Sequence, residues 1–137
     1  MALFTDGKIS TIHDLTAYDS GVMNLAAVEG IDLTVKLGLA RQELAVELEC
    51  VLPRDVRLEC VVVTPPLKLW HAFHTLELIY RDAYNNQLND RYKGKWEQYR
   101  ELSGWAAEKL LQTGVGITPN PVPQAAAPKL SVQPGGT

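Results

Sequence analysis

Cysteine is scarce in this sequence, which has two cysteines among its 137 residues. Cys50 and Cys60 show no CxxC spacing, so they indicate reduced structural thiols of a chain made in the cytosol. No apolar run approaches the ~18 residues that indicate a transmembrane helix. The opening residues, MALFTDGKIS, lack the charged and apolar regions of a secretory signal. We therefore expect no membrane contact.

Positive charge is also limited. The chain has 13 lysines and arginines against 16 acidic residues, a net charge of −3 and a pI of about 5.6. A protein whose main task is to grip nucleic-acid phosphates is usually basic. We expect at most transient, non-specific contact with DNA.

One stretch nevertheless has the composition of a nucleic-acid platform. Residues 89–100, NDRYKGKWEQYR, interleave basic side chains with aromatic rings that could stack on bases. In a helix, however, Tyr92, Trp96 and Tyr99 share one face and the lysines point elsewhere. We interpret the aromatic stripe as core packing, with nucleic-acid binding through 91–100 as an alternative.

The common catalytic and cofactor motifs are missing: the sequence has no GxSxG, no P-loop and no GxGxxG. The strongest set of metal-ligating residues is His71, His74 and Glu77, in HAFHTLE. This spacing could bring the three to one helix face, but it differs from the HExxH arrangement of zinc enzymes. We interpret these residues as structural and expect no enzyme activity, no cofactor and no metal.

Helical periodicity is abundant. Apolar and aromatic residues follow spacings of three and four in two stripes, at 33, 37, 40, 44, 48 and 51 and at 69, 73, 76, 80 and 83. A third stripe, at 92, 96, 99, 106 and 110, has the same spacings except for one interval of seven. Capping signals predict short helices over 11–18 and 20–29 and a longer one from Asp32 to Pro53. Pro65 and Pro66 open a long helix, and a second ends at Gly114. The polar run NNQLND near 85–90 predicts a turn that makes these two an antiparallel hairpin.

Residues 54–64, RDVRLECVVVT, are the one plausible strand. Val56, Leu58, Cys60 and Val62 alternate with their neighbours at a period of two. No hairpin turn follows, so we interpret the segment as an extended connection that pairs with a tail or with another subunit.

The composition changes at Gly114. The last residues, GVGITPNPVPQAAAPKLSVQPGGT, hold most of the chain's eight prolines and have Lys129 as their sole charge. Such a segment favours extended, polyproline-like chain. We divide the protein into a helical domain, 1–113, and an extended arm, 114–137, that docks on a neighbour. The residues predicted to form this interface are Ile117, Pro119, Pro121, Val122, Pro123, Leu130 and Val132.

The layout of short helices, a long aromatic-rich hairpin and a proline-rich arm resembles that of small head–tail connector, or adaptor, proteins of tailed phages. The likeness covers residues 11–137 and is strongest in LWHAFHTLELIYRDAYNNQLNDRYKGKWEQYRELSGWAAEKLL, residues 69–111. It implies no catalytic residues. It implies a homo-oligomeric ring in the neck of the virion, partners in the portal and in tail or neck proteins, and DNA passing through the ring.

The expected fold class is therefore mainly α, a small helical bundle built on a long antiparallel hairpin. The alternative functions are a cytosolic helical module that binds proteins, or a nucleic-acid-binding protein that uses 91–100. A ring of many copies would separate the connector from both alternatives.

Overall fold

The structure is a computed structural model that describes residues 2–7 and 9–119. Within these residues the chain is helical, with two isolated β-bridges and no β-strand. The predicted fold class is confirmed. In chain order the elements are η1 (Phe4–Asp6), α1 (Ile12–Tyr18), α2 (Val22–Glu29), α3 (Leu33–Val51), η2 (Leu58–Cys60), α4 (Pro65–Gln87) and α5 (Asp90–Thr113).

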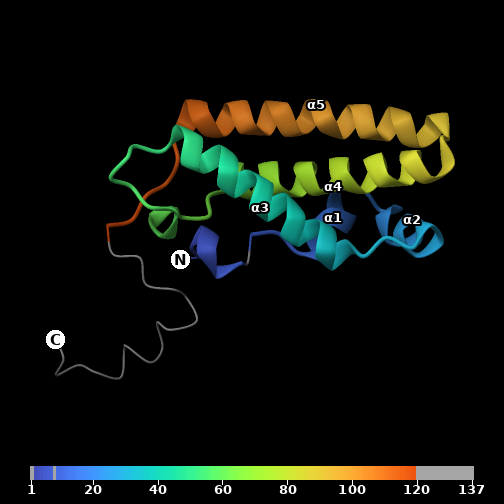
Figure 1. The fold of residues 1–137 in the computed structure, drawn as a ribbon, viewed down its shortest axis with the longest axis horizontal. Coiled ribbons are helices and arrows are strands. Elements are labelled where there is room, and N and C mark those ends of the chain that lie inside the picture. Colours follow the sequence, from blue (N-terminus) through green and yellow to red (C-terminus); the bar gives the residue numbers. More distant parts are fainter. Residues whose placement is uncertain (1, 8, 120–137) are drawn as a thin grey trace, which may run out of the picture.

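The hairpin of α4 and α5 is the longest feature of the molecule (Figure 1). Pro65 is the first residue of α4, where its missing N–H leaves no hydrogen bond unmade. The helix ends at Leu88, which takes a left-handed conformation with φ of 53°. Asn89 then caps α5, its side chain accepting a hydrogen bond from the Arg91 N–H at 2.9 Å. The predicted turn is confirmed, with α4 extending to Gln87.

The shorter helices begin where side chains can satisfy their first N–H groups. Thr11 and Asp14 form the predicted capping box: the Thr11 N–H donates to the Asp14 carboxylate at 2.8 Å. Asp32 caps α3 by accepting from the Thr34 N–H at 3.0 Å. Gly30 ends α2 with φ of 68°, a left-handed conformation that glycine adopts without steric cost.

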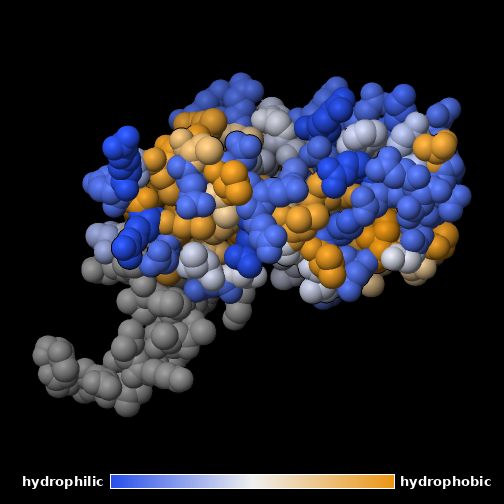
Figure 2. All heavy atoms as spheres, in the orientation of Figure 1, coloured by the Kyte–Doolittle hydropathy of each residue, from blue (hydrophilic) through white to orange (hydrophobic). Residues whose placement is uncertain are grey.

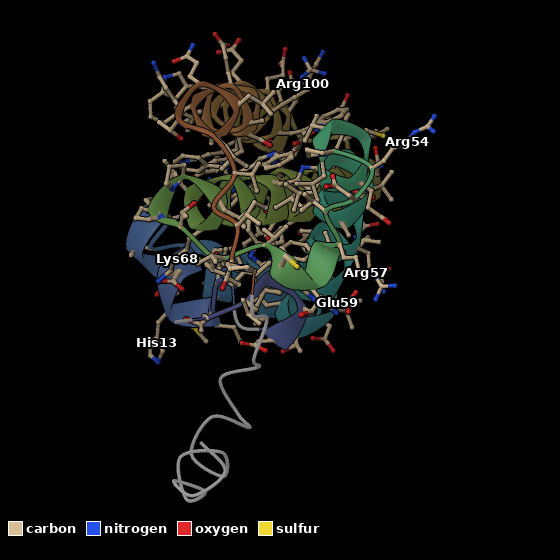
Figure 3. All side chains as sticks on the ribbon, turned by 90° about the vertical axis from the view of Figure 1, so that its left-hand side faces the viewer. His13, Arg54, Arg57, Glu59, Lys68 and Arg100 are labelled. Atoms are coloured by element: carbon tan, nitrogen blue, oxygen red, sulfur yellow. The ribbon has the colours of Figure 1, made fainter. Side chains whose placement is uncertain are left out.

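Helix α4 lies at the centre of the molecule. Seen along the hairpin in Figure 3, α5 covers one side of α4, α3 lies to its right and α1 to its left. Two groups of buried side chains follow from this arrangement. The larger lies between α1, α2, α4 and α5, and the smaller joins η1, α3 and the start of α4 near the chain ends.

The predicted stripes supply much of this core. From α3, Leu33, Ala40, Leu44 and Leu48 are buried; from the hairpin, Phe73, Leu76, Tyr80, Ala83, Tyr99, Ala106 and Leu110 are buried. Two expectations were wrong. Val51 is 47% exposed because it is the last residue of α3, and Trp96 is only partly buried because it packs near the open, polar end of the hairpin.

Apolar side chains also reach the surface. Figure 2 shows hydrophobic atoms gathered around α3, with hydrophilic side chains along α5 above them. Val35 and Val46 contribute to this exposed apolar surface. Among the helices described, none is both long and apolar enough to span a bilayer.

Candidate functional site

The arm starts beside the N-terminus, where three extended segments meet at one end of the molecule (Figure 1). The middle segment is 60–63, and on one side the Phe4 N–H donates to the Val61 carbonyl at 2.9 Å. Leu3 forms the β-bridge on this side, and both of its backbone groups that face away from the middle segment are hydrogen-bonded to Asp6. The Asp6 carboxylate accepts from the Leu3 N–H at 2.9 Å, and the Asp6 N–H donates to the Leu3 carbonyl at 3.0 Å.

The start of the arm lies on the other side of this middle segment. The Val62 N–H donates to the Gly116 carbonyl at 2.8 Å, and Val61 and Ile117 face each other as an antiparallel bridge. In this pairing the N–H and C=O of Ile117 point away from the domain. In the part of the chain that the structure describes, neither group has a backbone hydrogen-bond partner. Ile117 therefore forms an open edge.

The structure places two of the residues predicted for the arm interface. Ile117 is 42% exposed, and Pro119 is exposed. The remaining five, Pro121, Val122, Pro123, Leu130 and Val132, lie outside the described residues. We expected contacts outside the domain from residue 115 onward, and for 116–118 this is wrong. These residues pair with their own chain because 60–63 offers backbone groups that need partners, and an intrachain contact has no cost of association.

The predicted strand over 54–64 is present only as an extended connection. The expectation that it pairs with the tail is confirmed. The predicted alternation holds over 56–60, where partly buried Val56, Leu58 and Cys60 alternate with exposed neighbours, but it ends at Val61, which is fully buried. The regular strand is replaced by the 3₁₀ turn of η2 over 58–60.

The stretch 91–100 directs its aromatic rings into the hairpin. Tyr99 is buried, with its ring centroid 5.6 Å from that of Tyr80. Trp96 stacks on Tyr84 at 5.9 Å. Arg100 points from α5 into solvent (Figure 3). The core interpretation is confirmed for Tyr99, and both rings pack against tyrosines of α4.

The histidines of HAFHTLE separate into two environments. The His71 side chain is buried, and its Nε2–H donates to the Leu37 carbonyl at 2.9 Å. Burial lowers the pKa of His71, so the ring is neutral. This orientation directs His71 away from His74, and the three predicted residues do not converge on one point.

His74 bridges α3 and α4 through two carboxylates. Its Nδ1 lies 3.1 Å from Glu77, as the spacing suggested, and its Nε2 lies 2.6 Å from Glu43. Burial alone would lower the pKa of His74, but the hydrogen bonds that its ring donates to the two carboxylates outweigh burial and raise the pKa overall. Sequence spacing missed Glu43 because it comes from a different helix.

The structure also contains a buried carboxylate, in the connection between α1 and α2. Asp19 accepts hydrogen bonds from the hydroxyls of Tyr80 at 2.6 Å and Tyr99 at 2.9 Å, and from the Gly21 N–H at 3.0 Å. The Lys95 ammonium lies 3.8 Å from the same carboxylate. Asp19 therefore joins the α1–α2 connection to both helices of the hairpin, and α2 begins at Val22 as a result.

The aromatic stripes of the sequence could have indicated that such a hydrogen-bond network exists. Burial, together with the neighbouring carboxylate, raises the pKa of the Tyr80 and Tyr99 hydroxyls, so both remain donors. A buried tyrosine hydroxyl needs a partner. Two tyrosines in the predicted core therefore required an acceptor, which the pattern could not identify.

These features describe a packed helical domain with residues 116–118 paired to its own chain. Across residues 2–7 and 9–119, no three His, Cys, Asp or Glu side chains are grouped to hold a metal ion. No protein-family model, curated protein or solved structure matches the chain.

Proposed function

We propose that the protein is a structural subunit that assembles with copies of itself through its arm. In its specific form, the proposal is a phage or phage-like particle protein of the virion neck: a head–tail connector ring that docks on the portal and lets DNA pass. The observation that carries it is how the arm departs from the domain.

Among the residues that the structure describes, the last backbone hydrogen bond between the arm and its own domain joins the Thr118 N–H to the Cys60 carbonyl at 2.8 Å. The domain-side segment before Cys60 turns into η2, so it offers no extended ladder for the arm to follow. Exposed Pro119 comes next, and its ring favours extended chain. These features support an arm that binds beyond its own domain.

The prolines make this arm unsuited to pairing along its outer edge. In an extended chain that continues from Ile117, alternate residues direct their nitrogen to the same side. Pro119, Pro121 and Pro123 occupy those positions and have no N–H to donate. Beyond Ile117 the arm would therefore bind a neighbour mainly through side chains.

The charge of the chain is compatible with a channel wall. A net charge of −3 and aromatic rings packed inside the hairpin favour weak contact with DNA, which a connector needs if DNA is to pass. The same features disfavour a dedicated nucleic-acid-binding protein.

The test is to compare the full chain with a chain that ends at Pro119. This boundary keeps the paired residues 116–118, so the helical domain should retain its circular dichroism and its unfolding midpoint. Native mass spectrometry should find a many-copy ring for the full chain and monomers for the truncated one. Negative-stain electron microscopy should show an open centre in the ring.

A length-preserving control is the full chain with Val122, Leu130 and Val132 replaced by serine. It should also fail to assemble, because the apolar contacts are lost while the arm keeps its length. Normal assembly of the truncated chain would contradict the arm's role. A monomeric full chain at all concentrations, alone and with a portal ring, would favour the cytosolic binding module.

A further inference from the structure

A hollow of about 500 Å³ lies along the side of the hairpin that carries α1. We call it the α1–α5 groove; it is lined mainly by Tyr18 from α1, Pro65, Pro66 and Leu69 from α4, and Trp105 and Lys109 from α5. Figure 3 shows Lys68 on this side of α4, the side opposite α3. Two aromatic rings and two prolines therefore make up half of its eight lining residues.

The two rings of this groove are unusually accessible. Tyr18 is 48% exposed and Trp105 47% exposed. Trp105 also borders a second hollow, of about 440 Å³, together with Leu102 and two polar residues of α5. The two hollows thus form a strip along α5 from Gln98 to Lys109, with Leu102 and Trp105 as its apolar residues on this helix. Exposed patches of this kind mark interaction sites, and tryptophan and tyrosine dominate the energetics of such sites.

The charged side chains that line the groove already contact other side chains of the same molecule. The Lys68 ammonium lies 3.4 Å from the Asp14 carboxylate. The Lys109 ammonium lies 5.9 Å from the centre of the Trp105 ring. An occupant therefore needs neither a strong charge nor a deep insertion, and an uncharged extended segment fits best.

We propose that the α1–α5 groove binds the proline-rich arm of a second copy of this chain, through residues 119–128, PNPVPQAAAP. The inference rests on the proposed function, that the arm docks on a neighbour. This segment carries no charge and contains four prolines, at 119, 121, 123 and 128. Proline-rich segments characteristically dock on grooves lined with aromatic rings, because their extended form loses little entropy on binding.

The length of the proposed binding segment matches the length of the strip along α5. From Gln98 to Lys109 the strip follows α5 for about 16 Å, at ~1.5 Å per residue. Five residues of polyproline-like chain also span about 16 Å, at ~3.1 Å per residue. The PNPVP portion alone can therefore cover both hollows and contact Trp105 between them.

The path of the arm favours a second copy over its own groove. A Cβ added at Gly116 would lie 2.9 Å from the Thr64 side chain, so the arm begins next to Pro65 at the groove wall. It then runs antiparallel to the middle segment and reaches Cys60, which leads away from Pro65. Its own arm would have to reverse direction to enter the groove, whereas the arm of a neighbour would not.

The test uses the full chain with a benzoylphenylalanine photo-crosslinker in place of Val122. Equal amounts of ¹⁴N- and ¹⁵N-labelled protein are mixed at low concentration, concentrated to allow assembly, and irradiated. Mass spectrometry should find mixed-isotope crosslinks to peptides that contain Trp105 or Leu69. Crosslinks confined to one isotope would show that the arm binds its own domain, and crosslinks elsewhere or none would remove the groove as the receptor; either result overturns the proposal.

A pair of substitutions in the otherwise native chain gives a second measurement. Trp105→Ala should raise the concentration needed for assembly by at least about tenfold, as loss of an aromatic anchor does. Leu111→Ala is the matched control, because Leu111 is 57% exposed on the same helix but does not line the groove. It should change that concentration less than about twofold. Equal effects of the two substitutions would overturn the inference.

The two proposals can fail separately. If truncation at Pro119 abolishes assembly while Trp105→Ala leaves it unchanged, the arm docks on a neighbour but not in this groove. If truncation has no effect, the proposed function fails and this inference fails with it.

Discussion

Replacing Asp19 with alanine should be among the most destabilising single changes in this protein. The substitution removes the acceptor for the Tyr80 and Tyr99 hydroxyls, which donate at 2.6 and 2.9 Å. Both tyrosines are almost fully buried, so water cannot replace the carboxylate without opening the core. Each unsatisfied buried hydroxyl costs about 1–3 kcal/mol. The two together should cost about 4 kcal/mol.

Urea unfolding followed by far-ultraviolet circular dichroism measures this loss. With a slope of about 2 kcal/mol per molar urea, a loss of 4 kcal/mol moves the midpoint down by about 2 M. Asp32→Ala is the control. It also removes a carboxylate that caps a helix, but an exposed one, and should cost only about 1 kcal/mol.

The cause of the destabilisation by Asp19→Ala can be tested separately from its size. In a chain that already carries Tyr80→Phe and Tyr99→Phe, no hydroxyl is left without an acceptor. There Asp19→Ala should cost about 1 kcal/mol, chiefly for the lost bond from the Gly21 N–H. If the cost is the same in both backgrounds, the orphaned hydroxyls are not its source and the reasoning is refuted.

Three further outcomes are expected. The His74 pKa is raised in the folded state, so the stability that this residue contributes is fully present below the unfolded value of about 6.5 and is lost as pH rises through the folded value. The stability difference between the wild type and His74→Gln should therefore shrink as pH rises above about 6.5, and a difference that grows would contradict the bridge to Glu43 and Glu77. Trp96→Ala should cost about 2–3 kcal/mol in thermal unfolding, less than a fully buried aromatic residue; a neutral effect would favour a role in stacking on bases. Fluorescence anisotropy at about 150 mM salt should show DNA binding no tighter than ~1 µM, and tight, salt-sensitive binding would support the nucleic-acid alternative.

Much of the helical framework was predictable because its signals are local. A capping box spans four residues, and the apolar period of a helix repeats within one or two turns. Thr11, Asp32, Pro65 and Gly114 could therefore be assigned as helix boundaries from their neighbours alone. The hairpin followed because a short polar turn between two long helices leaves them antiparallel.

The candidate site was less predictable because its contacts join distant parts of the chain. The Asp19 carboxylate meets a tyrosine from each hairpin helix, and Glu43 reaches a histidine on another helix. The partners in each of these contacts are too far apart in the sequence for a spacing pattern to reveal them. The α1–α5 groove was missed for the same reason, since Tyr18 and Trp105 lie far apart in the sequence.

The predicted boundary at residue 114 lies before residues 116–118, which still pair with the domain. Proline content indicated correctly that helix α5 stops before the arm, but not how much of the arm the domain retains. That depends on the middle segment, which pairs with the N-terminal segment on one side and with residues 116–118 on the other.

The contrast between the two edges of this arrangement supports the proposal that the arm, and not the N-terminus, reaches a neighbour. On the N-terminal side, the Asp6 carboxylate and N–H occupy both outer groups of Leu3, so no further chain can pair there. On the arm side, Ile117 is open, Pro119 follows, and the partner segment turns into η2 before more pairing can form. The domain thus holds 116–118 as an anchor for the arm. A substitution that weakens this anchor, such as Val62→Pro, removes the N–H that holds Gly116 and should loosen the arm without reaching its docking residues. Assembly should then weaken while the crosslinks from position 122 keep the same partners; a change of partners would show that the anchor selects the docking site as well as holding the arm.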